Sequence, residues 1–337
     1  MHNQSMGRKT FLLPTTISQE AREYFTSEFS PEIRDGHTYP EANDAAGWRQ
    51  YNRTELVKRA SVNKALRKRY EPTLIESVLG GVPVLDIRPR GWSENGKVVV
   101  YTHGGGYVGG IASDALDSAL PLAGESQLRI ISISYTLAPH ANFQQITDET
   151  TAVVRDLVSR GYRNQDIAIW GDSAGGGLAA ATALKFRDQG LGLLSGVVLW
   201  SPWADLTGSG DTYLTLAEVE PFFRFDVFLR RAALAYAGAE NPAHPFASPV
   251  FGDFARGYPP TLIQAGTREL LLSDSVRLYR KLDAAGIRVT LDLYEGMWHV
   301  FQFKPIDSPE SRRARRKTCE FLWACLFHSE NEHANNR

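Results

Sequence analysis

The sequence predicts an α/β fold built on a mostly parallel sheet. From about residue 74 onward, short apolar runs alternate with segments of helical periodicity. Apolar strands that alternate with helices are typical of a parallel sheet whose two faces are both covered by helices. The chain has 337 residues, of which 43% are hydrophobic and 22% charged, so it is long enough for one large domain with an appended cap.

Apolar runs of strand length define the expected sheet. The first two runs are joined by Gly80 and Gly81, which predicts an antiparallel hairpin at the sheet edge. The expected strands cover residues 74–79, 82–87, 98–101, 129–135, 167–170, 196–200, 261–265 and 289–294. Between and after the later strands, the expected helices cover residues 113–124, 146–160, 176–189, 273–285 and 309–327.

Two segments lie outside this alternation. The strongest helical pattern of the polar N-terminal part, 44–70, ends before Pro72. Between the strands that end at Trp200 and begin at Thr261, about 60 residues make too long a connection for an ordinary loop. The expected organisation is an N-terminal helical cap segment over 1–70, a main domain over 71–330 with a cap insertion at about 205–245 that includes a helix over 226–237, and a flexible tail over 331–337.

Composition and charge exclude several classes of function. The net charge of −1 argues against a nucleic-acid partner. No run of about 18 apolar residues predicts a membrane span, and the first residues lack a signal peptide. The two cysteines, Cys319 and Cys325, point in different directions on one expected helix and cannot form a disulfide within it. We therefore expect a cytoplasmic protein with reduced thiols.

The most informative motif is G-D-S-A-G at residues 171–175. It lies between an apolar strand and a helix that is rich in small residues. A serine at the apex of so tight a turn cannot bury its hydroxyl, and the flanking glycines let strand and helix approach closely. This arrangement is the nucleophile elbow of α/β-hydrolases, and it predicts Ser173 as the nucleophile.

Acyl transfer also needs a base and an acid, which follow the nucleophile in the order acid, then histidine. His299 lies after the last expected strand, where catalytic groups collect in open α/β sheets, and is the expected base. The expected acid is Glu269, which lies a few residues after the expected strand over 261–265. Asp274 is the alternative acid. Because Ser273 looks like a helix N-cap, however, Asp274 would face the helix dipole in the first turn and have a structural role.

An H-G-G-G segment at residues 103–106 follows a strand and predicts the oxyanion hole, with a further amide from Ala174. The same stretch, 104–109, also satisfies the G-x-G-x-x-G pattern of dinucleotide sites. A dinucleotide fold would place its acidic residue at the end of the next strand, whereas Glu125 precedes that strand. The oxyanion interpretation is therefore preferred, and no cofactor is expected.

Together these residues resemble the hormone-sensitive-lipase-like family of carboxylesterases, particularly its ε-lactone hydrolase or acetyl esterase branch. The likeness runs in family order over about residues 72–327, and its motifs are 103–106, 135–139, 171–175, 201–202, 269–274 and 296–299. It implies an α/β-hydrolase fold with a helical cap, oxyanion donors at Gly105, Gly106 and Ala174, and a homodimer as one expected state. By the same likeness, Asp172 helps to hold the elbow.

The chain departs from the family pattern at two positions. The triad acid is usually aspartate, whereas Glu269 is one methylene longer, which keeps Asp274 open as the alternative. The stretch after residues 135–139 usually begins with glutamate, and here it begins with His140. That second change has no chemical interpretation.

The expected reaction is hydrolysis of a small or medium, rather apolar ester, such as an acetyl or short-acyl ester or a lactone, through a Ser-His-Glu triad. It requires neither cofactor nor metal. Tyr107, Trp203 and Trp298 are the expected pocket residues because they adjoin the motifs, and aromatic residues 222, 223 and 225 occupy the insertion. An amidase, an acyltransferase or a dehydratase with the same triad, and a non-catalytic ligand receptor, are the alternatives.

Overall fold

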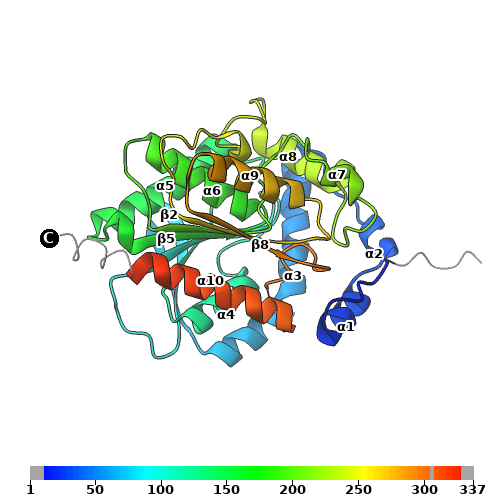
Figure 1. The fold of residues 1–337 in the computed structure, drawn as a ribbon, viewed down its shortest axis with the longest axis horizontal. Helices are drawn as coiled ribbons and strands as arrows, with labels where there is room; N and C mark the ends of the chain where they lie inside the picture. The colour runs from blue at the N-terminus through cyan, green and yellow to red at the C-terminus, as the bar shows by residue number, and fades with distance from the viewer. Residues whose placement is uncertain (1–10, 304–306, 328–337) are drawn as a thin grey trace, which may run out of the picture.

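The fold is organised around an eight-stranded sheet in a computed structural model, which describes residues 11–303 and 307–327 (Figure 1). The strand order is β1-β2-β4-β3-β5-β6-β7-β8. The strands are β1 (Thr73–Leu79), β2 (Val82–Arg88), β3 (Val98–Thr102), β4 (Ile130–Ile133), β5 (Ile167–Asp172), β6 (Gly196–Trp200), β7 (Thr261–Gly266) and β8 (Val289–Tyr294). These strands confirm the predicted α/β class.

The sheet is antiparallel only at its first edge. β1 pairs with β2, and β2 with β4, in antiparallel register, whereas all the remaining neighbours are parallel. Gly80 and Gly81 have φ angles of +57° and +83° and close the β1–β2 hairpin. Such left-handed geometry favours glycine, so these two residues account for the tight turn.

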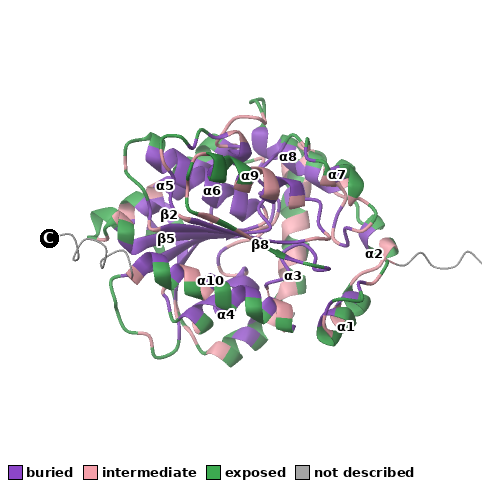
Figure 2. Ribbon diagram, in the orientation of Figure 1, coloured by how far each residue is buried: buried purple, intermediate pink, exposed green. Residues whose placement is uncertain are grey.

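Helices cover both faces of the sheet (Figure 1). One face carries α5 (Phe143–Ser159), α6 (Ala174–Asp188) and α9 (Leu272–Ala284), and the other carries α4 (Leu116–Ser126) and α10 (Pro309–Phe327). Two apolar clusters fill the layers between sheet and helices. The central strands are accordingly buried along their length (Figure 2).

The N-terminal part forms α1 (Gln19–Glu28), α2 (Pro31–Asp35) and α3 (Ala45–Tyr70). The Asp44 side chain accepts a hydrogen bond from the amide of Gly47 and caps α3. The helix ends at Tyr70, and the C-cap residue Glu71 has left-handed backbone angles. α3 packs against α4, so the predicted 44–70 helix reaches across to the main domain.

The long connection between β6 and β7 contains α7 (Thr212–Thr215), a π-helical turn over Phe225–Leu229, α8 (Arg230–Ala237) and a 3₁₀ turn over Pro249–Phe251. The expected helix over 226–237 therefore begins as a π turn. Within the described ranges, none of the helices is both long and apolar enough to cross a bilayer. The predicted tail over 331–337 lies outside the described residues.

Several element boundaries differ from the prediction by two or three residues; α5, for example, begins at Phe143 rather than at 146. β4 stops at Ile133 rather than at 135, although the Ser134 amide still follows the β2–β4 register by donating to the carbonyl of Pro83. Beyond it, the Tyr135 hydroxyl donates to the carbonyl of His103. The expected helix over 113–124 begins only at Leu116, because the preceding residues close a turn in which Asp114 donates to Ile111.

Candidate active site

Ser173 occupies the turn between β5 and α6 with φ 55° and ψ −126°, a strained conformation for a residue with a side chain. Its amide donates to the carbonyl of Trp200 at 2.8 Å. A Cβ atom on Gly171 would lie 2.1 Å from the Gly175 carbonyl oxygen, and one on Gly175 would lie 2.0 Å from that of Thr102. Both positions therefore require glycine for β5, α6 and β3 to approach this closely.

His299 lies in the loop that follows β8, with its Nε2 atom 2.9 Å from the Oγ atom of Ser173. Two contacts hold this loop. The amide of Val300 donates to the Ser201 hydroxyl at 3.0 Å. A Cβ atom on Gly266, at the end of β7, would lie 2.2 Å from the carbonyl oxygen of Met297. The close approach to β7 brings the imidazole to the serine.

Glu269 lies in the loop after β7 and contacts the other side of the imidazole. Its Oε2 atom is 2.9 Å from Nδ1 of His299, and the residue is fully buried. Its second oxygen, Oε1, has no hydrogen-bond partner among the described residues. The amide of Leu270 donates to the Glu220 carboxylate at 3.0 Å, which fixes the loop next to Glu269.

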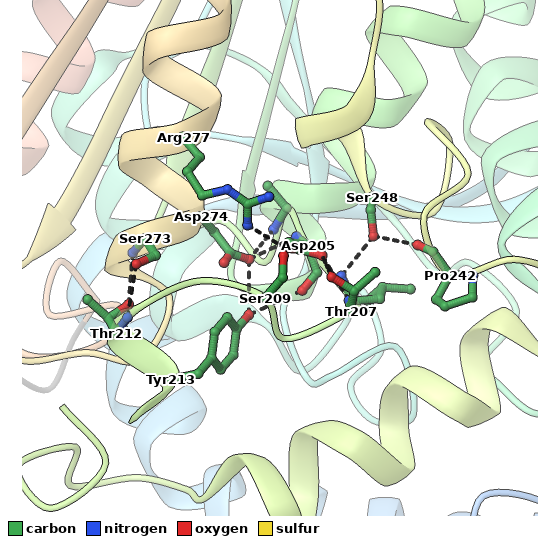
Figure 3. A network of polar contacts seen from close by, with 12 residues as sticks. Asp205, Thr207, Ser209, Thr212, Tyr213, Pro242, Ser248, Ser273, Asp274 and Arg277 are labelled. Atoms are coloured by element: carbon green, nitrogen blue, oxygen red, sulfur yellow. Dashed lines mark hydrogen bonds and ion pairs between the residues drawn. The ribbon is translucent and has the colours of Figure 1, made fainter. Parts of the chain in front are cut away.

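Asp274, the alternative acid, lies in another network (Figure 3). Its Oδ2 atom accepts hydrogen bonds from the amides of Ala204 and Asp205, at 2.9 and 2.8 Å, and from the Tyr213 hydroxyl at 3.1 Å. Burial raises the pKa of its carboxyl well above the usual range. These contacts join α9 to the insertion rather than to His299.

The expected N-cap role of Ser273 is wrong. Ser273 is the second residue of α9, and its side chain does not cap the helix. Its hydroxyl instead accepts from the amide of Thr212, and its amide donates to the Thr212 hydroxyl (Figure 3). Asp274 does lie in the first turn of α9, as expected, and its carboxylate is in addition held by the contacts with the insertion.

The H-G-G-G segment runs beside the elbow. A Cβ atom on Gly104 would lie 3.1 Å from Cβ of Ser173. Gly105 and Gly106 have φ angles of +117° and +64°, and within the described chain their amides donate to no backbone acceptor. Ala174 is the first residue of α6, where amides are free of intrahelical bonds.

His103 is the first residue of this segment, and its contacts indicate a structural role rather than proton transfer. Its ring is buried and stacks on Tyr135 at 4.3 Å between ring centroids, and its Nδ1 lies 2.8 Å from the carbonyl oxygen of Gly104. Burial lowers the pKa of His103 to about 4, so the ring is neutral near pH 7. His103 therefore positions the loop that carries the glycines.

Asp172, next to the nucleophile, is also buried. Its carboxylate accepts a hydrogen bond from the Tyr101 hydroxyl. Burial raises the pKa of Asp172 to about 6, although the bond from Tyr101 opposes this shift. The contact ties the end of β5 to β3, in agreement with the expected role of Asp172 in holding the elbow.

Ser173 and His299 open into a cavity of about 270 Å³. An aromatic group and a polar group of side chains share its wall. The aromatic residues are Tyr39, Tyr51, Tyr101, Phe222, Phe223, Phe228 and Phe303, and the polar ones include Arg59, Asp117, Ser118 and Asp172. The N-terminal part, the insertion and the main domain all contribute to this lining.

The predicted pocket residues Tyr107, Trp203 and Trp298 do not line this cavity. All three are fully buried. Tyr107 stacks between Trp203 and Tyr236, at 5.5 and 3.6 Å between ring centroids. A position next to a motif in the sequence does not determine where a side chain points. The prediction that these three residues line the pocket is therefore wrong, and their role is in packing.

Trp298 shows the reason most clearly. Its ring stacks on Tyr24 at 6.0 Å and also contacts Phe25 and Phe29 of the N-terminal part. His299 lines the cavity, whereas the neighbouring Trp298 packs against α1. Of the insertion aromatics named from sequence, 222 and 223 line the cavity, whereas Phe225 does not.

Sequence reasoning missed Glu220 and the residues from α3. Glu220 is fully buried, and its two carboxylate oxygens accept from the amides of Phe222 and Leu270 at 2.8 and 3.0 Å. Burial raises the pKa of Glu220 to about 7. No motif marked it, and a single acidic residue in a long insertion gives no signal of burial. Among residues 11–303 and 307–327, no group of His, Cys, Asp or Glu is arranged to hold a metal ion.

Comparisons with known proteins agree with this geometry. A family described as "alpha/beta hydrolase fold" matches residues 99–303. An esterase from Acinetobacter venetianus is 30% identical over 81% of this chain and 96% of its own length. An acetyl-hydrolase from Streptomyces hygroscopicus is 33% identical over 70% of this chain and 78% of its own length.

Solved structures extend the likeness to the whole fold. One crystal structure of an esterase has a TM-score of 0.86 at 26% identity and covers 94% of this chain and 97% of that chain. An esterase from the bacterial hormone-sensitive lipase family has a TM-score of 0.72 at 34% identity and covers 76% of this chain and 85% of that chain.

The chain belongs to the hormone-sensitive-lipase-like family of carboxylesterases. Its membership confirms the predicted α/β-hydrolase fold and the predicted class, a carboxylic ester hydrolase.

Proposed function

We propose that the protein hydrolyses small to medium esters, such as acetyl or short-acyl esters or lactones, through a Ser173-His299-Glu269 triad. One observation carries this proposal. The imidazole of His299 is within 2.9 Å of the serine hydroxyl on one side and of the glutamate carboxylate on the other, beside a cavity. This is the geometry that nucleophilic catalysis by serine needs.

In the first step, the Ser173 hydroxyl attacks the ester carbonyl while Nε2 of His299 takes its proton. The carbonyl oxygen becomes an oxyanion, and the amides of Gly105, Gly106 and Ala174 are the proposed donors to it. Glu269 accepts a hydrogen bond from Nδ1 and so holds the imidazole tautomer that can take the proton. The imidazolium then protonates the leaving alcohol, and the acyl-enzyme remains.

In the second step, His299 takes a proton from water, and the resulting hydroxide attacks the acyl carbonyl. The same amides stabilise the second oxyanion. The imidazolium returns its proton to Ser173 as the carboxylic acid is released. Glu269 stays ionised throughout and stabilises the imidazolium in both steps.

The N-terminal segment and the insertion act together as the cap in this proposal. Tyr39 and Phe228, one from each, contact each other at 4.7 Å between ring centroids and line the cavity. Phe223 adds an edge-on contact with the His299 ring at 5.0 Å. These aromatic contacts favour an apolar acyl or alcohol group of limited size.

The proposal is tested by hydrolysis of p-nitrophenyl acetate, butyrate and octanoate by the wild-type protein and Ser173→Ala. The expected result is turnover that favours the shorter chains and that is lost in the variant, because the cavity is small. Unchanged turnover by folded Ser173→Ala would overturn the assignment of the nucleophile. Failure of the folded wild-type protein to hydrolyse any of the three esters would contradict the proposed activity.

A further inference from the structure

Four polar side chains in the cavity, three of them charged, have no part in the acyl-transfer steps. We call them the Arg59 cluster: Arg59 of α3, Asp117 and Ser118 of α4, and Asp172 at the end of β5. All four line the cavity that contains Ser173 and His299. Charged side chains are rare in a wall that only has to hold an alkyl chain, so their presence indicates a polar feature of the substrate.

Arg59 keeps hydrogen-bonding capacity toward the cavity. Its Nη1 atom is 3.5 Å from Oδ2 of Asp117, its one ion-pair partner in the described chain. That distance is longer than a good hydrogen bond, and a guanidinium carries five N–H donors. The side chain of Arg59 is 43% exposed, against 11% for that of Asp117. Donors of Arg59 are therefore accessible to a ligand in the cavity.

The acceptors of the cluster are more deeply buried. Asp117 and Asp172 are each 8% exposed. One oxygen of Asp117 accepts from the Ser118 amide at 3.0 Å, and one oxygen of Asp172 accepts from the Tyr101 hydroxyl. The other oxygen of Asp117 faces Arg59 at the 3.5 Å given above, and the other oxygen of Asp172 has no hydrogen bond among the described residues. Each carboxylate can therefore still accept a hydrogen bond from a ligand.

Glu55 and Lys58 also line the cavity, but they pair with each other at 2.6 Å. The remaining charges, those of the Arg59 cluster, select one type of polar group. A substrate carboxylate would be attracted by Arg59 but repelled by Asp117 and Asp172. A substrate ammonium would be attracted by the carboxylates but repelled by Arg59. A hydroxyl group both donates and accepts, so it can bond to a carboxylate and to the guanidinium without adding a charge.

We infer that the Arg59 cluster binds a neutral hydroxyl group of the substrate, so that the enzyme acts on hydroxylated short esters. This inference rests on the proposed function and specifies its substrate class. The hydroxyl can belong to the alcohol part, as in the monoester of a diol, or to the acyl part, as in the ester of a hydroxy acid. The aromatic residues of the cavity contact the remaining carbon chain.

The test compares esters of matched size. For the alcohol part, 2-hydroxyethyl butyrate is compared with propyl butyrate, and for the acyl part, ethyl 3-hydroxybutyrate with ethyl 3-methylbutyrate. In at least one pair, kcat/KM for the hydroxylated ester should exceed that of its partner by about tenfold, because a hydrogen bond to a charged group contributes that much. The pair that shows the preference identifies the part that carries the hydroxyl.

Two variants reverse the charge selection in opposite directions. Arg59→Met leaves carboxylates in excess, so it should raise kcat/KM for butyrylcholine relative to propyl butyrate and abolish the hydroxyl preference. Asp117→Asn should raise kcat/KM for monoethyl succinate relative to ethyl 3-methylbutyrate. Ratios within one variant cancel any general loss of activity, and a purely structural role would not move the two ratios in these directions.

Arg67→Met is the matched control. Arg67 lies on the same helix and donates to the carbonyl of Ser113, but it does not line the cavity. Its ratios should equal those of the wild-type protein. If neither pair shows a hydroxyl preference while p-nitrophenyl acetate is hydrolysed, the inference is overturned and the proposed function stands. If no ester is hydrolysed by folded wild-type protein, both are overturned.

Discussion

The carboxylate of Glu269 lies 2.9 Å from Nδ1 of His299, whereas that of Asp274 accepts three hydrogen bonds from the insertion. The two acids lie five positions apart in the sequence, and in the fold they contact different partners. This division separates a proposed role in catalysis from a role in stability.

The first prediction concerns these two acids. Glu269→Gln should lower kcat by about 10²- to 10⁴-fold while the protein stays folded, because an amide neither holds the correct tautomer nor stabilises the imidazolium. Asp274→Asn should keep most activity, because its amide oxygen can still accept from Ala204 and Asp205. Steady-state kinetics on p-nitrophenyl butyrate measure both, with circular dichroism as the check of folding.

Asp274→Ala completes this comparison. It removes the acceptor from two buried amides and a tyrosine hydroxyl, which should lower the free energy of unfolding by about 2 kcal/mol or more. Loss of turnover by folded Asp274→Asn together with normal turnover by Glu269→Gln would reassign the triad acid.

The second prediction concerns the oxyanion loop. Gly106 has a φ of +64°, and a Cβ atom there would lie 2.8 Å from Cζ of Phe228. Gly106→Ala should shift the proposed amide donor and lower kcat by about 10²- to 10³-fold. Gly286→Ala is the control, because Gly286 has a φ of +70° with no atom within 4 Å of an added Cβ. Equal losses of kcat in the two variants would contradict the oxyanion role.

The third prediction concerns the aromatic wall. Phe223→Ala should raise kcat/KM for p-nitrophenyl octanoate relative to the acetate by roughly tenfold, because it removes a ring beside His299 and enlarges the cavity. Phe225→Ala is matched in chemistry and belongs to the same insertion, but its ring packs on Tyr213 at 4.9 Å between centroids. That variant should lower the melting temperature and leave the ratio unchanged. A chain-length ratio that moves only in Phe225→Ala would refute this description of the wall.

The fourth prediction concerns Glu220 and pH. Burial raises the pKa of Glu220 to about 7 in the folded protein, from an ordinary value of 4.5. Between these values the folded state binds more protons than the unfolded state. The contribution of this group to stability is therefore fully present below pH 4.5 and is lost as pH rises toward about 7, by up to about 1.4 kcal/mol per pH unit.

Glu220→Gln removes this titration. The free energy of unfolding of the wild-type protein minus that of the variant should fall between about pH 5 and about pH 7 and level off above. Urea denaturation across this range measures the difference. A difference that stays constant, or that rises with pH, would show that Glu220 is not held with a raised pKa.

The elbow motif, the position of the expected base after the last strand and the alternation of strands with helices could be predicted because each depends on local sequence, whereas the spatial order of the strands in the sheet was not predicted. Gly171 and Gly175 are required by close backbone approach, and the motif around His299 follows a strand that periodicity already identifies. The choice between Glu269 and Asp274 as the acid required the structure. Only the structure shows that Asp274 is hydrogen-bonded to the insertion and that Ser273 lies inside its helix rather than at the N-cap.

The substrate cavity could not be predicted in the same way. Its lining depends on tertiary packing of α3 and the insertion, so Arg59 and Tyr39 carry no signal in the sequence near the motifs. Conversely, Trp298 adjoins the base in sequence and points into the packing around α1. The orientation of a loop side chain depends on the segments that pack over the loop, and a single sequence does not reveal which segments these are.

The central claim is that Ser173 is a nucleophile activated by His299. The most direct test is to treat the protein with a fluorophosphonate and locate the covalent adduct by mass spectrometry of its peptides. We expect a single adduct on the peptide that contains Ser173, no adduct in Ser173→Ala, and strongly slowed labelling in His299→Ala. An adduct on a different residue, with full ester turnover retained by Ser173→Ala, would contradict it.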